Sequence, residues 1–207
     1  MINSDIQIID AGLGNIASIQ RMIEKVGRTA VSVMNPNQLD RGGKVILPGV
    51  GHFDEGMSRL TATGFADVLV DLGKSQNIHV MGICLGMQLL CRGSEEGDLS
   101  GLGLVEADVT KFRFSAGSKL KVPHMGWNVV SASRENHLLP ASAEEQRFYF
   151  VHSYKVVPDD PTITIGTANY GGEFCAAFQQ GNVFGVQFHP EKSHRFGMEL
   201  MRRFVEL

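Results

Sequence analysis

The stretch VMGICLGMQ, residues 80–88, decides the fold of this chain, because it reads as an apolar strand, a tight turn and the start of a helix. Gly82 and Gly86 flank Cys84 in the turn. Small residues let the backbone bend sharply, so the cysteine is exposed at the tip, as in a nucleophile elbow with sulfur replacing the serine oxygen. The sulfur would also lie at a helix N-terminus, whose partial positive charge favours thiolate. The pattern predicts a reactive Cys84.

Apolar strands alternate with helical segments through the first half of the chain. Continuous apolar strands of this kind are typical of a parallel sheet that is covered by helices on both faces. A helical region is interrupted near Thr63-Gly64, where glycine favours a break. We expect strands at 6–10, 30–33, 44–47 and 78–83, and helices over 16–26 and 54–74.

The second half of the chain is rich in strands, and little helix intervenes before residue 194. Glycine and proline separate these strands, which favours largely antiparallel strands added to the same sheet. No stretch is rich enough in Pro, Gly or Ser to be a linker, so we expect one domain over residues 1–207 with an α/β fold and a mostly parallel mixed sheet. The expected strands are 105–114, 127–131, 148–153, 163–167, 174–178 and 183–187, followed by a helix over 194–205.

Composition excludes several classes of protein. The 207 residues are 43% hydrophobic and carry a net charge of −3, so nothing indicates a nucleic acid or an anionic membrane as partner. No apolar run approaches the roughly 18–20 residues of a membrane helix, and residues 1–5 lack a leader pattern. Three cysteines are too few for a disulfide framework, which favours a reducing cytoplasm.

A candidate base for the thiol follows a second apolar strand, in the string GVQFHPE at residues 185–191. The strand ends at His189, and Pro190 would hold the chain extended. Side chains two residues apart in extended chain point the same way, so the Glu191 carboxylate could reach the imidazole. Such a carboxylate orients the histidine and stabilises the imidazolium. Cys84, His189 and Glu191 therefore form a candidate catalytic triad.

Acyl transfer also needs donors for the developing oxyanion. The amide of Leu85, directly after the nucleophile, is one candidate. The second could come from Pro48-Gly49-Val50-Gly51, because glycines allow a close backbone approach or a peptide flip. These glycines fit a simple chain turn equally well.

Three strings together resemble the class I (triad) glutamine amidotransferases: GICLGMQ at 82–88, PGVG at 48–51 and FHPE at 188–191. Within that family, PHMGWN at 123–128, FVHSY at 150–154 and HPEKS at 189–193 resemble the glutaminase subunits of imidazole glycerol phosphate synthase, an enzyme of histidine biosynthesis. With GLGN at 12–15, the resemblance covers nearly the whole chain in order.

The resemblance implies hydrolysis of glutamine through a Cys84 thioester, with ammonia passed to a (β/α)8-barrel cyclase that makes imidazole glycerol phosphate and an aminoimidazole carboxamide ribotide. It implies a ligand-switched Gly49-Val50 peptide, with Val50 and Leu85 as oxyanion donors. The substrate contacts that it implies are Gly49, Gln88, Glu96, Ser153 and Tyr154, and the partner-facing residues are Asn15, His124, Trp127 and Lys192.

Other interpretations stay open. The same chemistry could supply ammonia to a different synthase, for example in surface-polysaccharide sugar modification. A non-catalytic interaction subunit and a stand-alone γ-glutamyl peptidase are weaker alternatives, because the triad is intact and the partner-type strings are present. Gln88, Glu96 and Lys192 could be ordinary solvated side chains, and Cys91 and Cys175 small buried hydrophobes. No histidine spacing indicates a metal, and we expect no cofactor.

Overall fold

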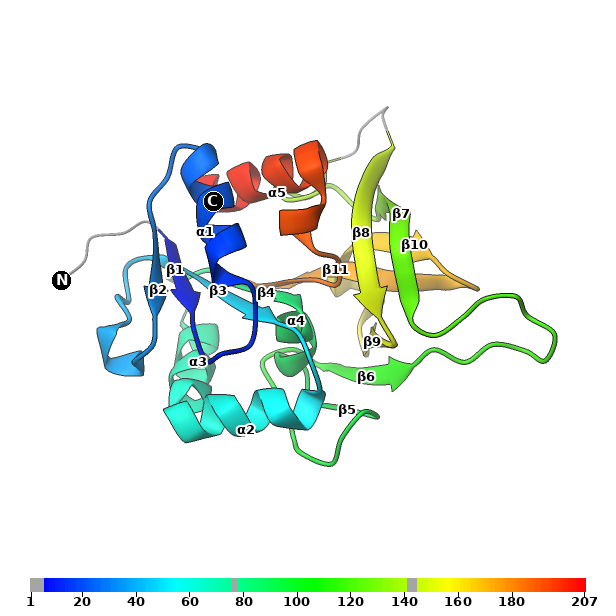
Figure 1. Cartoon of the computed structure of the whole chain (residues 1–207), viewed down its shortest axis with the longest axis horizontal. Coiled ribbons are helices and arrows are strands. Elements are labelled where there is room, and N and C mark those ends of the chain that lie inside the picture. Colours follow the sequence, from blue (N-terminus) through cyan, green and yellow to red (C-terminus); the bar gives the residue numbers. More distant parts are fainter. Residues whose placement is uncertain (1–5, 76–77, 141–144) are drawn as a thin grey trace.

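The computed structural model describes residues 6–75, 78–140 and 145–207 as one mixed sheet with helices on both sides (Figure 1). Residues 1–5, in which the sequence has no leader pattern, lie outside the described residues. Five strands run parallel in the order β2, β1, β3, β4, β12. Their bounds are β1 Ile6–Ile9, β2 Ala30–Val33, β3 Lys44–Gly49, β4 Val80–Cys84 and β12 Val183–Val186.

The remaining strands extend the sheet from β12 and are mostly antiparallel, as the sequence predicts. The path continues through β11, β10, β7 and β8, while β5, β6 and β9 pair beside it. Sequence patterns missed two of these strands, the two-residue β5 and β9, which follows β8 directly after Ser153. The bounds are β5 Gly93–Ser94, β6 Ala107–Lys111, β7 His124–Ala132, β8 Gln146–His152, β9 Tyr154–Pro158, β10 Thr164–Asn169 and β11 Glu173–Gln180.

Two helical layers cover the parallel strands, and each closes its own apolar core. Helices α1 (Ile16–Lys25) and α5 (His194–Glu206) pack on one face, while α2 (Phe53–Thr63), α3 (Phe65–Lys74) and α4 (Leu85–Leu89) pack on the other. The predicted break in the second helical region is confirmed at Gly64, which has a left-handed φ of 79°. Three short 3₁₀ turns complete the elements: η1 Pro36–Gln38, η2 Pro161–Ile163 and η3 Pro190–Lys192.

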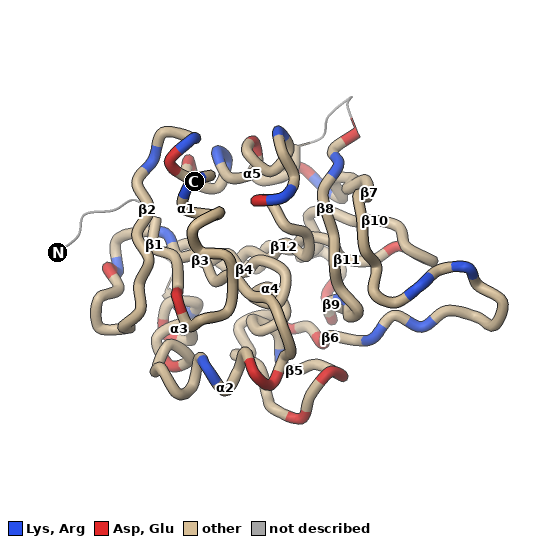
Figure 2. The backbone as a smooth tube through the Cα atoms, in the orientation of Figure 1, with Lys and Arg blue, Asp and Glu red and all other residues tan. Residues whose placement is uncertain are grey.

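Alternation along the strands explains the two cores. In β1, Ile6 and Ile8 contribute to the core under α1 and α5, whereas Ile9 belongs to the core under α2 and α3. Successive strand side chains point to opposite faces, so an apolar strand fills both layers. Charged residues of both signs are spread over the outside, with basic residues along the segment that joins β6 to β7 (Figure 2). Every helix among the described residues is too short or too polar to cross a membrane.

Candidate active site

Cys84 ends β4 in a conformation that residues with a Cβ rarely adopt, with φ 55° and ψ −110°. Such strain costs about 1–3 kcal/mol and is typical of functional sites. The two predicted elbow glycines are sterically required. A Cβ on Gly82 would lie 2.6 Å from the carbonyl oxygen of Gly86, and a Cβ on Gly86 would overlap the carbonyl oxygen of Leu47. The elbow expected from residues 80–88 is therefore present, but the expected exposure of the cysteine is wrong, because Cys84 is buried with 7% of its surface exposed.

The helix after the elbow is shorter than the sequence suggests, because α4 ends at Leu89. A helix of five residues has a much smaller dipole than a long one, so its support for a thiolate is weaker than expected from the sequence.

Neighbouring strands bring the other site residues to the same edge of the sheet. Gly49 at the end of β3 pairs in register with Cys84, and β12 runs parallel to β4 on the other side. Ligands of open α/β sheets bind at the carboxyl ends of such strands. A Cβ on Gly49 would lie 2.6 Å from the amide nitrogen of Gly86, so only glycine lets β3 approach the elbow so closely.

His189 and Glu191 form a buried pair, with His189 Nδ1 2.8 Å from Glu191 Oε1. The extended chain that the sequence predicts around Pro190 is wrong, because Pro190 to Lys192 form the 3₁₀ turn η3. The turn still returns the carboxylate to the ring. The backbone of His189 is held in turn by Ser193, whose hydroxyl donates to the His189 carbonyl at 2.6 Å and accepts from the Tyr149 amide at 3.0 Å.

Burial by itself lowers the pKa of His189, but the Cys84 thiol and the Glu191 carboxylate together outweigh it and raise that pKa to about 9. His189 Nε2 is buried and makes no well-formed hydrogen bond to a described residue. Since Nδ1 faces Glu191, Nε2 is the nitrogen left for proton transfer on the Cys84 side. This is the arrangement of a nucleophile, a base and an orienting acid.

The amide of Val50, a predicted oxyanion donor, is engaged elsewhere. It donates to the Leu13 carbonyl at 2.6 Å. An amide that is bonded to Leu13 is not available to an oxyanion at Cys84. The Leu85 amide, at the first position of α4, has no partner within the helix. Of the two predicted donors, the Leu85 amide thus lacks a helical partner, whereas the Val50 amide is bonded to Leu13.

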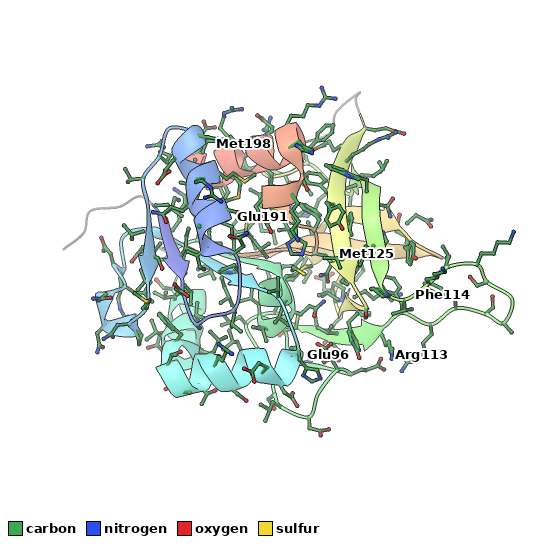
Figure 3. All side chains as sticks on the ribbon, viewed as in Figure 1. Glu96, Arg113, Phe114, Met125, Glu191 and Met198 are labelled. Atoms are coloured by element: carbon green, nitrogen blue, oxygen red, sulfur yellow. The ribbon has the colours of Figure 1, made fainter. Side chains whose placement is uncertain are left out.

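A cavity of about 300 Å³ opens beside the nucleophile, within the range of small-molecule sites. Glu96 lines the cavity, and its Oε2 accepts from the Phe53 amide at 2.9 Å. Its neighbour Glu95 instead pairs with Arg113 on the surface. Figure 3 shows Glu96 near α2 and Glu191 near α1 and α5. The lining residues are Val50, Gly51, Cys84, Leu85, Gln88, Glu96, Pro123, Val151, His152, Ser153, Tyr154 and His189.

Gln88 is nearly buried, and its amide nitrogen has interior partners. Nε2 donates to the Tyr154 carbonyl at 3.3 Å and to Gln187 Oε1 at 2.9 Å. Both amide hydrogens are used in this way, which leaves the carbonyl oxygen of Gln88 as its group for a ligand. Gln187 is fully buried and donates in turn from Nε2 to Cys84 Sγ at 3.8 Å.

His124, which the sequence places towards a partner, lies in the interior with only 3% of its surface exposed. It packs between Phe150 and Tyr170, and its Nδ1 is 2.9 Å from His152 Nε2. His152 Nδ1 then donates to the Tyr154 carbonyl at 2.7 Å. Burial lowers the pKa of His124 to about 4 and that of His152 to about 3, so both rings are neutral near pH 7.

The other three residues that the resemblance places towards a partner are exposed. Asn15 caps α1 by accepting from the Ser18 amide at 3.2 Å. Trp127 stacks on His194 with ring centroids 5.4 Å apart and keeps 48% of its surface exposed. Lys192 is exposed, with its Nζ 5.7 Å from the centre of the Tyr149 ring.

Two thiols lie away from this chemistry. Cys91 and Cys175 are buried, as predicted, and burial raises the pKa of both, that of Cys175 to about 12. In the described part of the chain, no group of three or more His, Cys, Asp or Glu side chains could hold a metal ion.

The fold, the cysteine elbow and the neighbouring His189–Glu191 pair are typical of one class of enzyme, and comparison with known families identifies that class. Residues 7–207 match the family described as glutamine amidotransferase class-I, and the chain belongs to that family. It is 47% identical over 201 residues to imidazole glycerol phosphate synthase subunit HisH 2 of Methanococcus maripaludis, covering 97% of this chain and 98% of the relative. It is 48% identical over 202 residues to the protein of the same name from Pseudomonas aeruginosa, covering 98% and 99%.

The chain is also similar to relatives named HisH without the numeral 2, and to solved structures. HisH of Leptospira interrogans is 43% identical over 203 residues, covering 98% of this chain and all of the relative. The structure of PurLQS from Thermotoga maritima superposes with a TM-score of 0.69 at 19% identity, covering 97% of each chain. A glutamine amidotransferase structure from the same organism gives a TM-score of 0.60 at 19% identity, covering 97% of this chain and 80% of that one. At such identity these structures support the fold alone.

Sequence reasoning missed several residues that the structure brings to the site. Gln187 touches the sulfur, Ser193 anchors His189, and His152 lines the cavity. One signal was available for Gln187: a polar residue directly after the apolar strand 183–186 is buried only with a specific partner.

Proposed function

We propose that this chain is the glutaminase subunit of an imidazole glycerol phosphate synthase, and that Cys84, His189 and Glu191 are its catalytic triad. The observation that carries the triad is the buried His189–Glu191 pair beside a strained cysteine elbow. Near full-length similarity at more than 40% identity to HisH subunits supports the assignment to this enzyme. The family match over residues 7–207 supports one amidotransferase domain.

The triad performs two acyl transfers. His189 Nε2 takes the proton of the Cys84 thiol as Sγ attacks the side-chain carbonyl carbon of glutamine, and the electron pair of the carbonyl moves onto its oxygen. The tetrahedral intermediate collapses as His189 Nε2 gives its proton to the departing nitrogen, which releases ammonia and leaves a glutamyl thioester. His189 then takes a proton from water, which attacks the thioester; the second tetrahedral intermediate breaks its C–S bond to release glutamate, and the proton returns from His189 to the Cys84 sulfur. Glu191 holds the imidazole through Nδ1 in both steps.

Substrate recognition follows from the charges around the cavity. The Glu96 carboxylate suits the α-ammonium of glutamine, and backbone amides around Ser153 and Tyr154 suit its α-carboxylate. Gly49 leaves room at the elbow, and Gln88 offers its carbonyl oxygen. The oxyanion forms between the amides of Leu85 and Val50, the second after the Val50 amide leaves Leu13.

The partner that we propose is a (β/α)8-barrel cyclase, which takes the ammonia and turns a phosphoribulosyl-formimino nucleotide into imidazole glycerol phosphate and an aminoimidazole carboxamide ribotide. Exposed apolar side chains support a docking face: Val50 lines the cavity and is 51% exposed, and Met125 and Trp127, on β7 beside the cavity-lining strand β8, are 62% and 48% exposed. Asn15 and Lys192 extend this face. Three free thiols fit a reducing cytoplasm.

A second candidate function keeps the glutaminase reaction but supplies the ammonia to a different synthase. Two of the relatives bear the numeral 2 in their names, as a second copy of a subunit would. A second copy can serve another synthase, such as one that amidates a surface-polysaccharide sugar, because the elbow recognises glutamine and not the ammonia acceptor.

The experiment that tests the proposal is glutamate release from glutamine by the purified chain, alone and with a histidine-pathway barrel cyclase and its nucleotide ligand. Strong stimulation supports the glutaminase and this client together. Absence of stimulation, with Cys84 still labelled by a glutamine-analogue electrophile, supports the second candidate. Absence of both activity and labelling contradicts the glutaminase itself, and Cys84→Ala is the control for each arm.

A further inference from the structure

Gln187 is the side chain in the described structure that donates a hydrogen bond to the nucleophile. Its Nε2 lies 3.8 Å from Cys84 Sγ, and the residue is fully buried between the end of β12 and the His189 turn. Sγ itself points towards the Val151 carbonyl at 4.0 Å, which can only accept. A thiolate therefore has one side-chain N–H from Gln187 on one side and the His189 imidazole as its proton partner.

The hydrogen-bond chain fixes which end of Gln187 faces the sulfur. A backbone carbonyl can only accept, so the Tyr154 carbonyl requires the amide nitrogen of Gln88 to face it. That nitrogen also contacts Gln187, which must present its oxygen in return. The opposite end of the Gln187 amide, its NH₂ group, then faces Cys84. A flipped Gln187 would set two NH₂ groups against each other and leave an acceptor against the sulfur.

Such a donor matters because α4 is too short to supply much of a helix dipole. Hydrogen bonds to ionised acceptors are about twice as strong as those between neutral groups, so the N–H of Gln187 stabilises the thiolate more than the thiol. Because this amide is fixed, it also orients Cys84 Sγ between the cavity and His189. Resting on the proposed glutaminase chemistry, we propose that Gln187 is a catalytic residue that holds the Cys84 sulfur and stabilises its thiolate.

The test follows thiolate formation directly through the rate at which iodoacetamide alkylates Cys84 between pH 5 and 10. Gln187→Met removes the donor at similar volume, and the nearly isosteric Gln187→Glu places an oxygen against the sulfur. We expect alkylation at pH 7 to slow about tenfold in both variants and the midpoint to move up by about one pH unit. Wild-type profiles in both variants overturn the proposal.

Gln7 provides a matched control, because it is a buried glutamine in β1 whose side chain bonds, among the residues that the structure describes, only to the backbone of Asp40. Gln7→Met removes a buried amide far from the site, so it should lower the stability of the chain and leave the alkylation profile of Cys84 unchanged. An equal shift in Gln7→Met means that any lost core amide has this effect, and it also overturns the role of Gln187.

A measurement on the wild-type chain covers the case in which both Gln187 variants fail to fold. The side-chain NH₂ resonances of Gln187 should follow the titration of Cys84 and lose that titration in Cys84→Ala, while those of Gln7 stay constant. Gln187 resonances that do not titrate overturn the proposal. Labelling by a glutamine-analogue electrophile distinguishes failure of the proposed glutaminase from failure of the role of Gln187. An unlabelled wild-type chain refutes the glutaminase. A labelled chain whose Gln187 variants alkylate like wild type, or whose Gln187 resonances do not titrate, refutes this inference alone.

Discussion

The amide of Val50 donates to the Leu13 carbonyl at 2.6 Å, so the loop after β1 holds the peptide that should complete the oxyanion hole. Leu13 is buried, whereas the side chain of Val50 is half exposed at the mouth of the cavity. A molecule that docks on Val50 can therefore act on a peptide whose resting position is set from the interior. This relationship gives a physical basis for a glutaminase that is slow alone and fast in its complex.

The amide hydrogen of Val50 is predicted to be an oxyanion donor in the complex, and a proline at this position removes it. Val50→Pro has no N–H, so it should lower partner-stimulated glutamate release by about 100-fold, the usual effect of losing one oxyanion donor. Val50→Ala keeps the amide and should retain most of the stimulated rate. The measurement is the turnover number at saturating glutamine in the complex. Equal rates in the two variants would mean that the donor comes from another peptide.

Gly49 is predicted to tolerate no side chain, because a Cβ there meets the Gly86 amide at 2.6 Å and Leu85 Cβ at 2.8 Å. Gly49→Ala should push β3 away from the elbow and lower glutamate release by at least about tenfold. Gly27→Ala is the matched control: its φ is 85°, with open space around the added Cβ. It should cost about 1 kcal/mol of unfolding free energy and leave turnover intact. A fully active Gly49→Ala contradicts the close approach.

Much of the fold could be predicted from the sequence, because the first half alternates continuous apolar strands with helices and places glycine at its breaks. The strand β9 was missed since the chain changes direction at Ser153 without glycine or proline. The triad was visible as motifs, but the geometry that joins Glu191 to His189 was not, because a proline can open a 3₁₀ turn as readily as extend a chain. The contact from Gln187 to Cys84 joins residues 103 positions apart, which no local pattern indicates.

The strained backbone of Cys84 predicts a trade between stability and activity. Glycine adopts φ values near 55° without a Cβ penalty, so Cys84→Gly should be about 1 kcal/mol more stable than Cys84→Ala, the reverse of their order in ordinary strand or helix positions. Urea unfolding of the two variants measures the difference, and both should release no glutamate. Cys175→Ala is the activity control, because that buried thiol lies outside the site. If Cys84→Gly proves less stable than Cys84→Ala, the elbow is not strained in solution.

The raised pKa of His189 predicts how stability depends on pH. Histidine titrates near 6.5 in an unfolded chain, whereas the Cys84 thiol and the Glu191 carboxylate outweigh burial and bring His189 to about 9. The protonated ring therefore favours the folded state: the contribution is complete below pH 6.5 and is lost as the pH rises through 9. It amounts to at most about 3 kcal/mol. Urea unfolding at pH 6 and pH 10 should show this loss in the wild-type chain, and His189→Asn should show much less of it. Equal losses in the two chains would place the titrating group elsewhere.

Trp127 is predicted to be an anchor of the proposed cyclase interface. Its ring lies flat against His194 and remains 48% exposed, and exposed aromatic side chains of this kind often dominate binding energy. Trp127→Ala should raise the dissociation constant of the complex at least about 30-fold, a loss of about 2 kcal/mol, without changing the unfolding midpoint of the isolated chain by more than a small amount. Met34→Ala is the matched control, because Met34 is 71% exposed after β2, away from the cavity mouth, and should leave binding unchanged. Titration calorimetry with the cyclase measures both constants. If Trp127→Ala binds as tightly as Met34→Ala, the cyclase docks on another face, and the exposed cavity mouth must serve a different partner.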